Sequence, residues 1–147
     1  MEKTEKYRLL ERQLAALLEG ETDAIAKMAN VAAVLHAEFG FWWTGFYRVA
    51  GEELILGPFQ GPVACMHIPY GKGVCGTAWA RNASVVVPDV EAFPGHIACS
   101  AASRSEIVVP VHGADGSVIA VLDIDSDKLA TFDETDRVWL EKIVTLL

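Results

Sequence analysis

Hydrophobic residues in the first forty positions recur at the spacing of helices. Residues 3–19 and about 22–38 each place apolar side chains three and four positions apart, which is the period of an amphipathic helix. The two stripes consist of Leu9, Leu10, Leu14, Leu17 and Leu18, and of Ile25, Met28, Ala29, Ala32 and Leu35. Gly20 separates the predicted helices. Thr22 is the expected N-cap of the second helix, and Gly40 is expected to end it.

After Gly40 the pattern changes to that of strands. Phe41 to Val49 and Leu54 to Phe59 flank a turn at 51–52, which predicts a hairpin. Short strands are predicted over 66–70 and 84–87, with a glycine-rich turn and a short helix ending near residue 81 between them. Residues 106–111 and 118–125 flank a second turn at 113–116 and predict a second hairpin.

The last segment is again helical. Asp133 is the predicted cap of a helix whose apolar residues are Val138, Leu140, Ile143, Val144 and Leu147. Residues 88–103 carry prolines, glycines and small side chains, so we expect a long loop with at most one helical turn. Loops of that length within a compact domain often form the walls of functional sites.

This order of elements predicts an α+β fold. Hairpins imply a central antiparallel sheet, and the N-terminal and C-terminal helices are expected to cover one face of it. We expect a single domain over residues 1–147. The N-terminal helices occupy about 1–39, and the sheet, the site loops and the last helix occupy about 40–147.

Composition and charge exclude several functions. The 147 residues are 52% hydrophobic, which is enough to bury a core without covalent staples. The net charge of −8 and the scattered basic residues argue against a nucleic-acid or anionic-membrane surface. The N-terminus lacks the apolar run of a secretory signal, and no stretch is long and apolar enough to span a bilayer. We therefore expect a cytoplasmic protein.

Three cysteines raise the question of chemistry. Cys65, Cys75 and Cys99 lie among small residues or glycines. An odd number of cysteines in a reducing compartment argues against a structural disulfide framework. They are then packing residues, metal ligands or reactive thiols. A zinc cluster of Cys65, His67, Cys75, His96 and Cys99 is one alternative, but its spacing lacks the usual paired ligands, so we expect no metal.

Gly71, Gly73 and Gly76 match the glycine pattern of dinucleotide-binding turns. Such a site needs a central parallel strand before the glycines and a full crossover helix after them. Here Pro69 interrupts the preceding strand, and the following helix is short. We therefore expect the glycines to permit a tight turn and a close backbone approach.

Acidic residues end an apolar strand in the second hairpin. Asp123 and Asp125 share one strand face, roughly 7 Å apart, and follow Ile119 and Val121 on that face. Counting back from the turn places Glu106 within one or two residues of Asp123. A carboxylate at the edge of an apolar face has a raised pKa, as a proton donor near neutral pH requires. The alternative is a strand end that opens into solvated loop.

Two further features complete a candidate site. Trp43 and Tyr47 share a strand face and offer an aromatic wall, although simple core packing is the alternative. Cys99 lies in an open stretch of the long loop, where His96 and Arg104 would favour its thiolate. A thiolate, a partner thiol and neutral acids suit the reduction of an oxygen-bearing sulfur. The cysteine becomes a sulfenic acid, a second cysteine condenses with it, and an external dithiol reduces the resulting disulfide.

Several short motifs surround the three cysteines and the acidic pair. They are WTGFY (43–47), GPFQG (57–61) followed by Cys65, GVCG (73–76), DV (89–90), FPGHIAC (93–99), SRSE (103–106) and LDIDS (122–126). With these motifs the chain resembles the free methionine-(R)-sulfoxide reductases, which are GAF-domain enzymes, from about residue 40 to the C-terminal helix. All three cysteines and the acidic pair lie in matching contexts.

The resemblance implies a role for each matching residue. Cys99 would attack the sulfoxide, Cys65 would be the main resolving cysteine, and Cys75 a second thiol able to pair with Cys99. The acids that hydrogen-bond or protonate the oxygen would be Glu106 and Asp125. Asp123 would bind the substrate, through its ammonium group, and the methyl end would be held by Trp43 and Tyr47.

The resemblance also implies a GAF fold with a pocket under loops, no cofactor, thioredoxin as reductant, and often a homodimer, for which the first helix is a candidate interface. Preference for the free amino acid has a physical reason, because a buried acid left without its ammonium partner costs free energy. The alternatives are a GAF-type module that binds a small molecule or senses redox state without turnover, and a thiol peroxidase.

Overall fold

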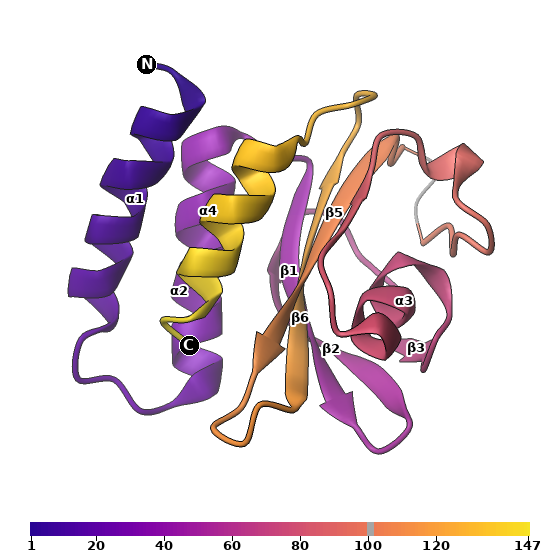
Figure 1. Cartoon of the computed structure of the whole chain (residues 1–147), viewed down its shortest axis with the longest axis horizontal. Coiled ribbons are helices and arrows are strands. Elements are labelled where there is room, and N and C mark those ends of the chain that lie inside the picture. Colours follow the sequence, from indigo (N-terminus) through magenta and orange to yellow (C-terminus); the bar gives the residue numbers. More distant parts are fainter. Residues whose placement is uncertain (100–101) are drawn as a thin grey trace.

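The computed structural model describes residues 1–99 and 102–147 and confirms the predicted α+β architecture with an antiparallel sheet (Figure 1). The sheet has the order β3-β2-β1-β6-β5-β4. Its strands are β1 (Trp43–Ala50), β2 (Glu53–Gln60), β3 (His67–Pro69), β4 (Val85–Val87), β5 (Ser105–His112) and β6 (Val118–Ser126). The helices are α1 (Lys3–Leu18), α2 (Ala24–Phe39), α3 (Gly73–Arg81) and α4 (Glu134–Val144), and a single 3-10 turn, η1 (Val90–Ala92), lies in the long loop.

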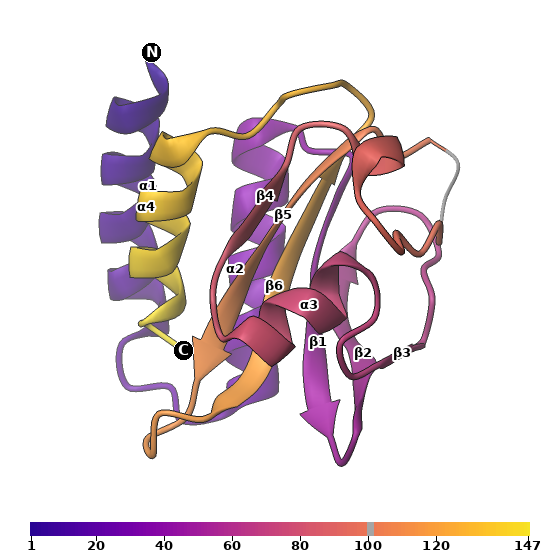
Figure 2. The same ribbon diagram turned by 45° about the vertical axis from the view of Figure 1, so that its right-hand side comes forward.

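The elements form layers on the two faces of the sheet. Helices α2 and α4 cover one face, and α1 lies outside them (Figures 1 and 2). Helix α3, η1 and the described part of the long loop lie on the opposite face (Figure 2). The helix-covered face holds the larger core, in which Leu35, Phe46, Leu122, Ile124 and Leu140 are all fully buried.

Helix α1 presents a narrower apolar ridge than predicted. Tyr7, Leu10, Leu14 and Leu18 are buried, whereas Leu9 and Leu17 are each 51% exposed. The buried residues recur at intervals of three and four, so they occupy a single helix face. One face suffices because α1 packs only against the outer side of the helical layer.

Two predicted helix ends are confirmed and one is wrong. Gly40 ends α2 in the left-handed conformation, with φ 67°, and Asp133 caps α4. The N-cap of α2 is Asp23 rather than Thr22, and its side chain accepts a hydrogen bond from the Ala26 amide at 2.9 Å. Thr22 and Asp23 are both good N-cap residues, and the path of the backbone determines which of the two caps the helix.

The glycines of residues 71–76 permit a tight turn and a close approach of the backbone, as predicted. Strand β3 is a short antiparallel strand at the sheet edge, which contradicts a dinucleotide-binding crossover. A Cβ on Gly76 would lie 2.6 Å from the Pro69 carbonyl oxygen, so glycine is required where the helix meets the strand.

Among the described residues, no helix has both the length and the apolar character needed to cross a membrane.

Candidate active site

Three adjacent strands of the sheet, β1, β6 and β5, bring the predicted acids together near one end of the strands. Asp125 on β6 pairs with Trp43 on β1 and with Glu106 on β5. Asp123, two residues earlier on β6, pairs with Gly45 and Val108. Because side chains alternate along a strand, all three carboxyl groups leave the sheet on the face opposite α2 and α4. The count from the hairpin turn therefore located Glu106 correctly.

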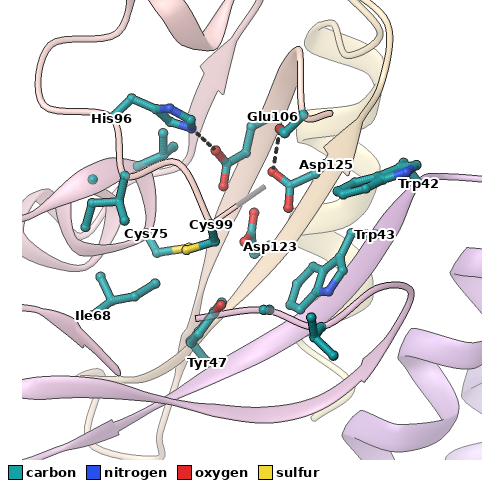
Figure 3. Close-up of a pocket in the computed structure, with 16 residues that line it drawn as sticks. Trp42, Trp43, Tyr47, Ile68, Cys75, His96, Cys99, Glu106, Asp123 and Asp125 are labelled. Atoms are coloured by element: carbon teal, nitrogen blue, oxygen red, sulfur yellow. Dashed lines mark hydrogen bonds and ion pairs between the residues drawn. The ribbon is translucent and has the colours of Figure 1, made fainter. Parts of the chain in front are cut away.

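A cavity of about 50 Å³ lies over these three acids, under α3 and the loops. It brings together seven of the eight predicted site residues, namely Trp43, Tyr47, Cys75, Cys99, Glu106, Asp123 and Asp125. Figure 3 shows the three carboxyl groups directed toward a common space, with the cysteines on one side of it and Trp43 on the other. The eighth residue, Cys65, joins the site through a covalent bond to Cys99.

Burial makes these carboxyl groups weak acids. Glu106 and Asp123 are each only 5% exposed. Burial raises the pKa of Glu106 well above its ordinary value, and the charges of Asp123 and Asp125 raise it further. Burial, followed by the charge of Asp123, likewise raises the pKa of Asp125. Both groups therefore hold protons at a pH where an exposed carboxyl group is ionised.

Asp123 differs from the other two acids. Burial raises its pKa, but Glu106 and the Cys75 thiol act in the opposite direction because they can donate hydrogen bonds to its carboxylate. These two donors favour the charged form of Asp123, whereas no such pair of donors to Glu106 offsets its burial. The Oδ1 atom of Asp123 is buried and has no hydrogen-bond partner within the described residues. A buried carboxylate oxygen that has no hydrogen-bond partner favours the binding of a ligand with a cationic hydrogen-bond donor.

A disulfide joins Cys65 and Cys99, whose Cα atoms are 5.4 Å apart. It links the segment 61–66 to the long loop, so the structure describes an oxidised state. The resemblance implied this pairing for the main resolving cysteine. Cys75 is free and buried, and burial and then the nearby acids raise the pKa of its thiol. A buried thiol with a raised pKa is a poor nucleophile.

The five-residue zinc cluster considered from the sequence does not form. Cys65 and Cys99 are bonded to each other, and the exposed His67 contacts Glu53, with Nδ1 and Oε1 3.1 Å apart. In the described part of the chain, one group of candidate metal ligands is close enough to share an ion, formed by Cys75, Glu106 and Asp123. Metal binding would have to displace the protons that burial keeps on the thiol and on Glu106, which disfavours it.

Trp43 and Tyr47 form an aromatic wall that also holds the cysteine segment. Their ring centroids are 5.9 Å apart. Trp43 Nε1 donates to the Pro62 carbonyl oxygen at 3.0 Å, and the Tyr47 hydroxyl donates to the Cys65 carbonyl oxygen at 2.9 Å. Gly45 makes room for the indole, because a Cβ there would lie 2.6 Å from Trp43 Cη2. Core packing alone does not account for these two directed hydrogen bonds.

The long loop adds two polar groups that sequence reasoning did not assign to the acids. His96 Nε2 lies 3.8 Å from Glu106 Oε1, although we expected His96 to act on Cys99. The Ser103 hydroxyl donates to Asp125 Oδ1 at 3.3 Å. The signal for Ser103 was its place in the SRSE motif beside Glu106. Arg104, expected to assist Cys99, is exposed and does not line the cavity.

Comparison with known proteins places this site in a family. The GAF domain model matches residues 19–147, so the chain is a GAF-domain protein. It is 55% identical to GAF domain-containing protein A of Dictyostelium discoideum, over 99% of this chain and 92% of that protein. It is 47% identical to the free methionine-R-sulfoxide reductase of Escherichia coli, over 100% of this chain and 89% of that protein.

A solved structure agrees with these relatives. The free methionine-R-sulfoxide reductase from Neisseria meningitidis, in complex with its substrate, superposes with a TM-score of 0.96 at 52% identity, covering 99% of this chain and 88% of that one. The chain belongs to the free methionine-(R)-sulfoxide reductase family.

Proposed function

We propose that this protein is an oxidoreductase that converts free L-methionine (R)-S-oxide to L-methionine, with Cys99 as the nucleophile. The observation that carries the proposal is the position of Cys99. It lines the same small cavity as Glu106 and Asp125 and is bonded to a second cysteine. An attacking thiol, a resolving thiol and two protonated acids are the groups that the reduction of a sulfoxide requires.

The reaction starts when the Cys99 thiolate attacks the sulfoxide sulfur. Glu106 or Asp125 donates a proton to the oxygen, which passes from the substrate sulfur to the Cys99 sulfur while the bond between the two sulfur atoms breaks. The electron pair of that bond stays on the substrate sulfur, so the products are methionine and a sulfenic acid on Cys99. The Cys65 thiol then displaces water from the sulfenic acid and forms the disulfide. An external dithiol restores both thiols by exchange. In total, one sulfoxide and one dithiol give one sulfide, one disulfide and one water.

Substrate recognition uses the third acid and the aromatic wall. The unpartnered Oδ1 of Asp123 would accept a hydrogen bond from the ammonium group. Trp43 and Tyr47 would contact the methyl end. A methionine within a peptide has no ammonium group to offer, so its binding would leave the buried Asp123 carboxylate unpaired. The oxidised cavity of about 50 Å³ holds a few waters at most, so the reduced state must be the one that binds substrate.

Three further parts of the proposal concern the setting of the enzyme. Thioredoxin would be the dithiol, and the cytoplasm would be the compartment, because the cycle needs a reducing environment to restore the thiols. The third part of the proposal is that the protein forms a homodimer. The exposed Leu9 and Leu17 on α1 support that helix as its interface.

The test compares the wild type with single cysteine variants on four substrates. These are the free R- and S-sulfoxides of methionine and the same two sulfoxides within a short peptide, each with excess dithiothreitol. The wild type should turn over only the free R-sulfoxide, and the Cys99→Ser variant should produce no methionine.

The Cys65→Ser variant supplies the second readout, without added dithiol. It should release about one methionine per chain and retain a sulfenic acid that a dimedone reagent captures. Sustained turnover by Cys99→Ser would refute the mechanism. Sulfoxide binding without methionine release by the wild type would indicate a sensing module instead.

A further inference from the structure

The proposed reaction leaves a protonation problem at Glu106. The side chain is 7% exposed, and Glu106 lies on β5, which pairs with β4 on one side and with β6 on the other. Once it has given a proton to the departing oxygen, it is a buried carboxylate beside Asp123 and Asp125. A new proton must reach it before the next turnover, and its burial limits direct access by water.

His96 is the group placed to supply that proton. Its Nε2 lies 3.8 Å from Glu106 Oε1, and its side chain is 16% exposed, so the ring contacts both the acid and solvent. Figure 3 shows the imidazole directed at the Glu106 carboxyl group. It is the one basic side chain among the described residues that line the cavity.

The loop around His96 is held in place by its neighbours rather than by the imidazole. The His96 amide donates to the Phe93 carbonyl oxygen at 3.2 Å. Ile97 packs against Gly73 of α3, where a Cβ would lie 3.0 Å from Ile97 Cδ1. A substitution of the His96 side chain should therefore leave the loop backbone in position.

We propose that His96 carries a proton from solvent to Glu106 between turnovers, an inference that rests on the proposed function. Solvent protonates the neutral imidazole, and the imidazolium gives its Nε2 proton to the Glu106 carboxylate. The imidazole is then neutral again, and one proton has moved from water to the acid. That proton replaces the one transferred to the sulfoxide oxygen, and no oxidant or reductant is involved.

The surroundings of His96 suit a carrier. The titratable groups that share the cavity with it are Glu106 on β5, Asp123 and Asp125 on β6, Cys75 on α3, Tyr47 on β1 and, once the disulfide is reduced, Cys99 of the same loop. Burial lowers the pKa of His96, while the charge of Asp123 opposes that shift. The resting imidazole is therefore neutral near pH 7, and it gains a proton more readily once Glu106 becomes negative.

The experiment separates the first turnover from later ones. In His96→Ala, reduced enzyme mixed with the free R-sulfoxide should form its first methionine at the wild-type rate, because Glu106 starts protonated. Steady-state turnover with excess dithiothreitol should fall about 10²-fold or more, because assisted proton transfer typically contributes about 10²–10⁴-fold. Added imidazole should restore turnover to His96→Ala, and the loss should grow as the pH rises.

His67→Ala is the matched control, since that histidine is exposed and pairs with Glu53 outside the cavity. It should behave as the wild type. Unchanged steady-state turnover and pH profile in His96→Ala would overturn the proposal. So would a slower first turnover that imidazole does not restore, because that result indicates a structural role. If His96→Ala does not fold, the same measurements on His96→Gln decide. An inactive wild type would instead reject the proposed function itself.

Discussion

Strands β5 and β6 carry two sets of buried residues, one on each face of the sheet. Ile107 and Leu122 face the helices, and their chain neighbours Glu106 and Asp123 face the cavity. Burial barely distinguishes the two sets, since Ile107 is 1% exposed and Glu106 is 5% exposed. The two sets differ in the type of side chain, apolar on one face and acidic on the other. Alternation along a strand directs adjacent residues to opposite faces of the sheet, so each set has its own surroundings.

The comparison shows that burial has opposite consequences on the two faces. On the helix face it removes apolar surface from water and stabilises the fold. On the cavity face it disfavours the charged form of each acid and so raises the pKa of Glu106 and Asp125. The second face contributes less to stability than an apolar face would, but it keeps the proton donors that the proposed chemistry uses.

The largest expected effect is on the cavity face. Replacement of Glu106 by glutamine keeps the shape of the side chain but removes the acidic proton of the carboxyl group. Reductase activity should therefore fall by about 10²–10⁴-fold. The measurement is the rate of methionine formation from the free R-sulfoxide. Ile107→Val is the matched control on the next position of β5 and should keep the wild-type rate. If Glu106→Gln is as active as that control, the acid on this face is not a proton donor.

The second effect is on the helix face. Leu122→Ala should lower the free energy of unfolding by about 2–5 kcal/mol, because it leaves a cavity in the larger core. Urea unfolding followed by tryptophan fluorescence measures the change. Activity per folded molecule should stay close to that of the wild type. A large loss of activity in fully folded Leu122→Ala would mean that the two faces are not independent.

The smallest effect is a slope of stability with pH. The folded-state pKa values of Glu106 and Asp125 are raised, so these groups add stability below about pH 4, where they are protonated in both states. That contribution declines as the pH rises from about 4 through the raised pKa values, by up to about 1.4 kcal/mol per pH unit for each group.

Other acids of the protein also titrate in this range, so the informative quantity is the difference between two proteins. Urea unfolding of the wild type and of Glu106→Gln from pH 4 to 8 should show a shallower decline in the variant. Equal slopes would contradict a raised pKa at Glu106.

Much of this arrangement could be predicted from the sequence. Alternation along the second hairpin located Asp123, Asp125 and Glu106 on one face, because strand periodicity is local and turn length determines the pairing. The helix spacing predicted α1 and α2, but it placed Leu9 and Leu17, which are each 51% exposed, in the same stripe as the buried leucines of α1. How many faces of a helix are covered depends on neighbours that a periodic pattern does not specify.

The long loop was the part that could not be predicted. Its length indicated a site wall, but no periodicity determines where His96 and Ser103 lie. His96 is close to Cys99 in sequence, which suggested an effect on the thiol, whereas its ring faces Glu106 on β5. The Ser103 contact with Asp125 likewise depends on how the loop crosses the sheet.

The two aromatic side chains have a consequence for engineering. Trp43 and Tyr47 border the cavity with their rings and anchor the backbone on both sides of Val63 and Ala64 with their polar atoms. An attempt to broaden the substrate range by trimming either ring would also release the segment that carries Cys65. In the proposed mechanism, selectivity and regeneration of the thiols would thus be linked through the same pair of residues, and a variant library that changes one should be screened for the other.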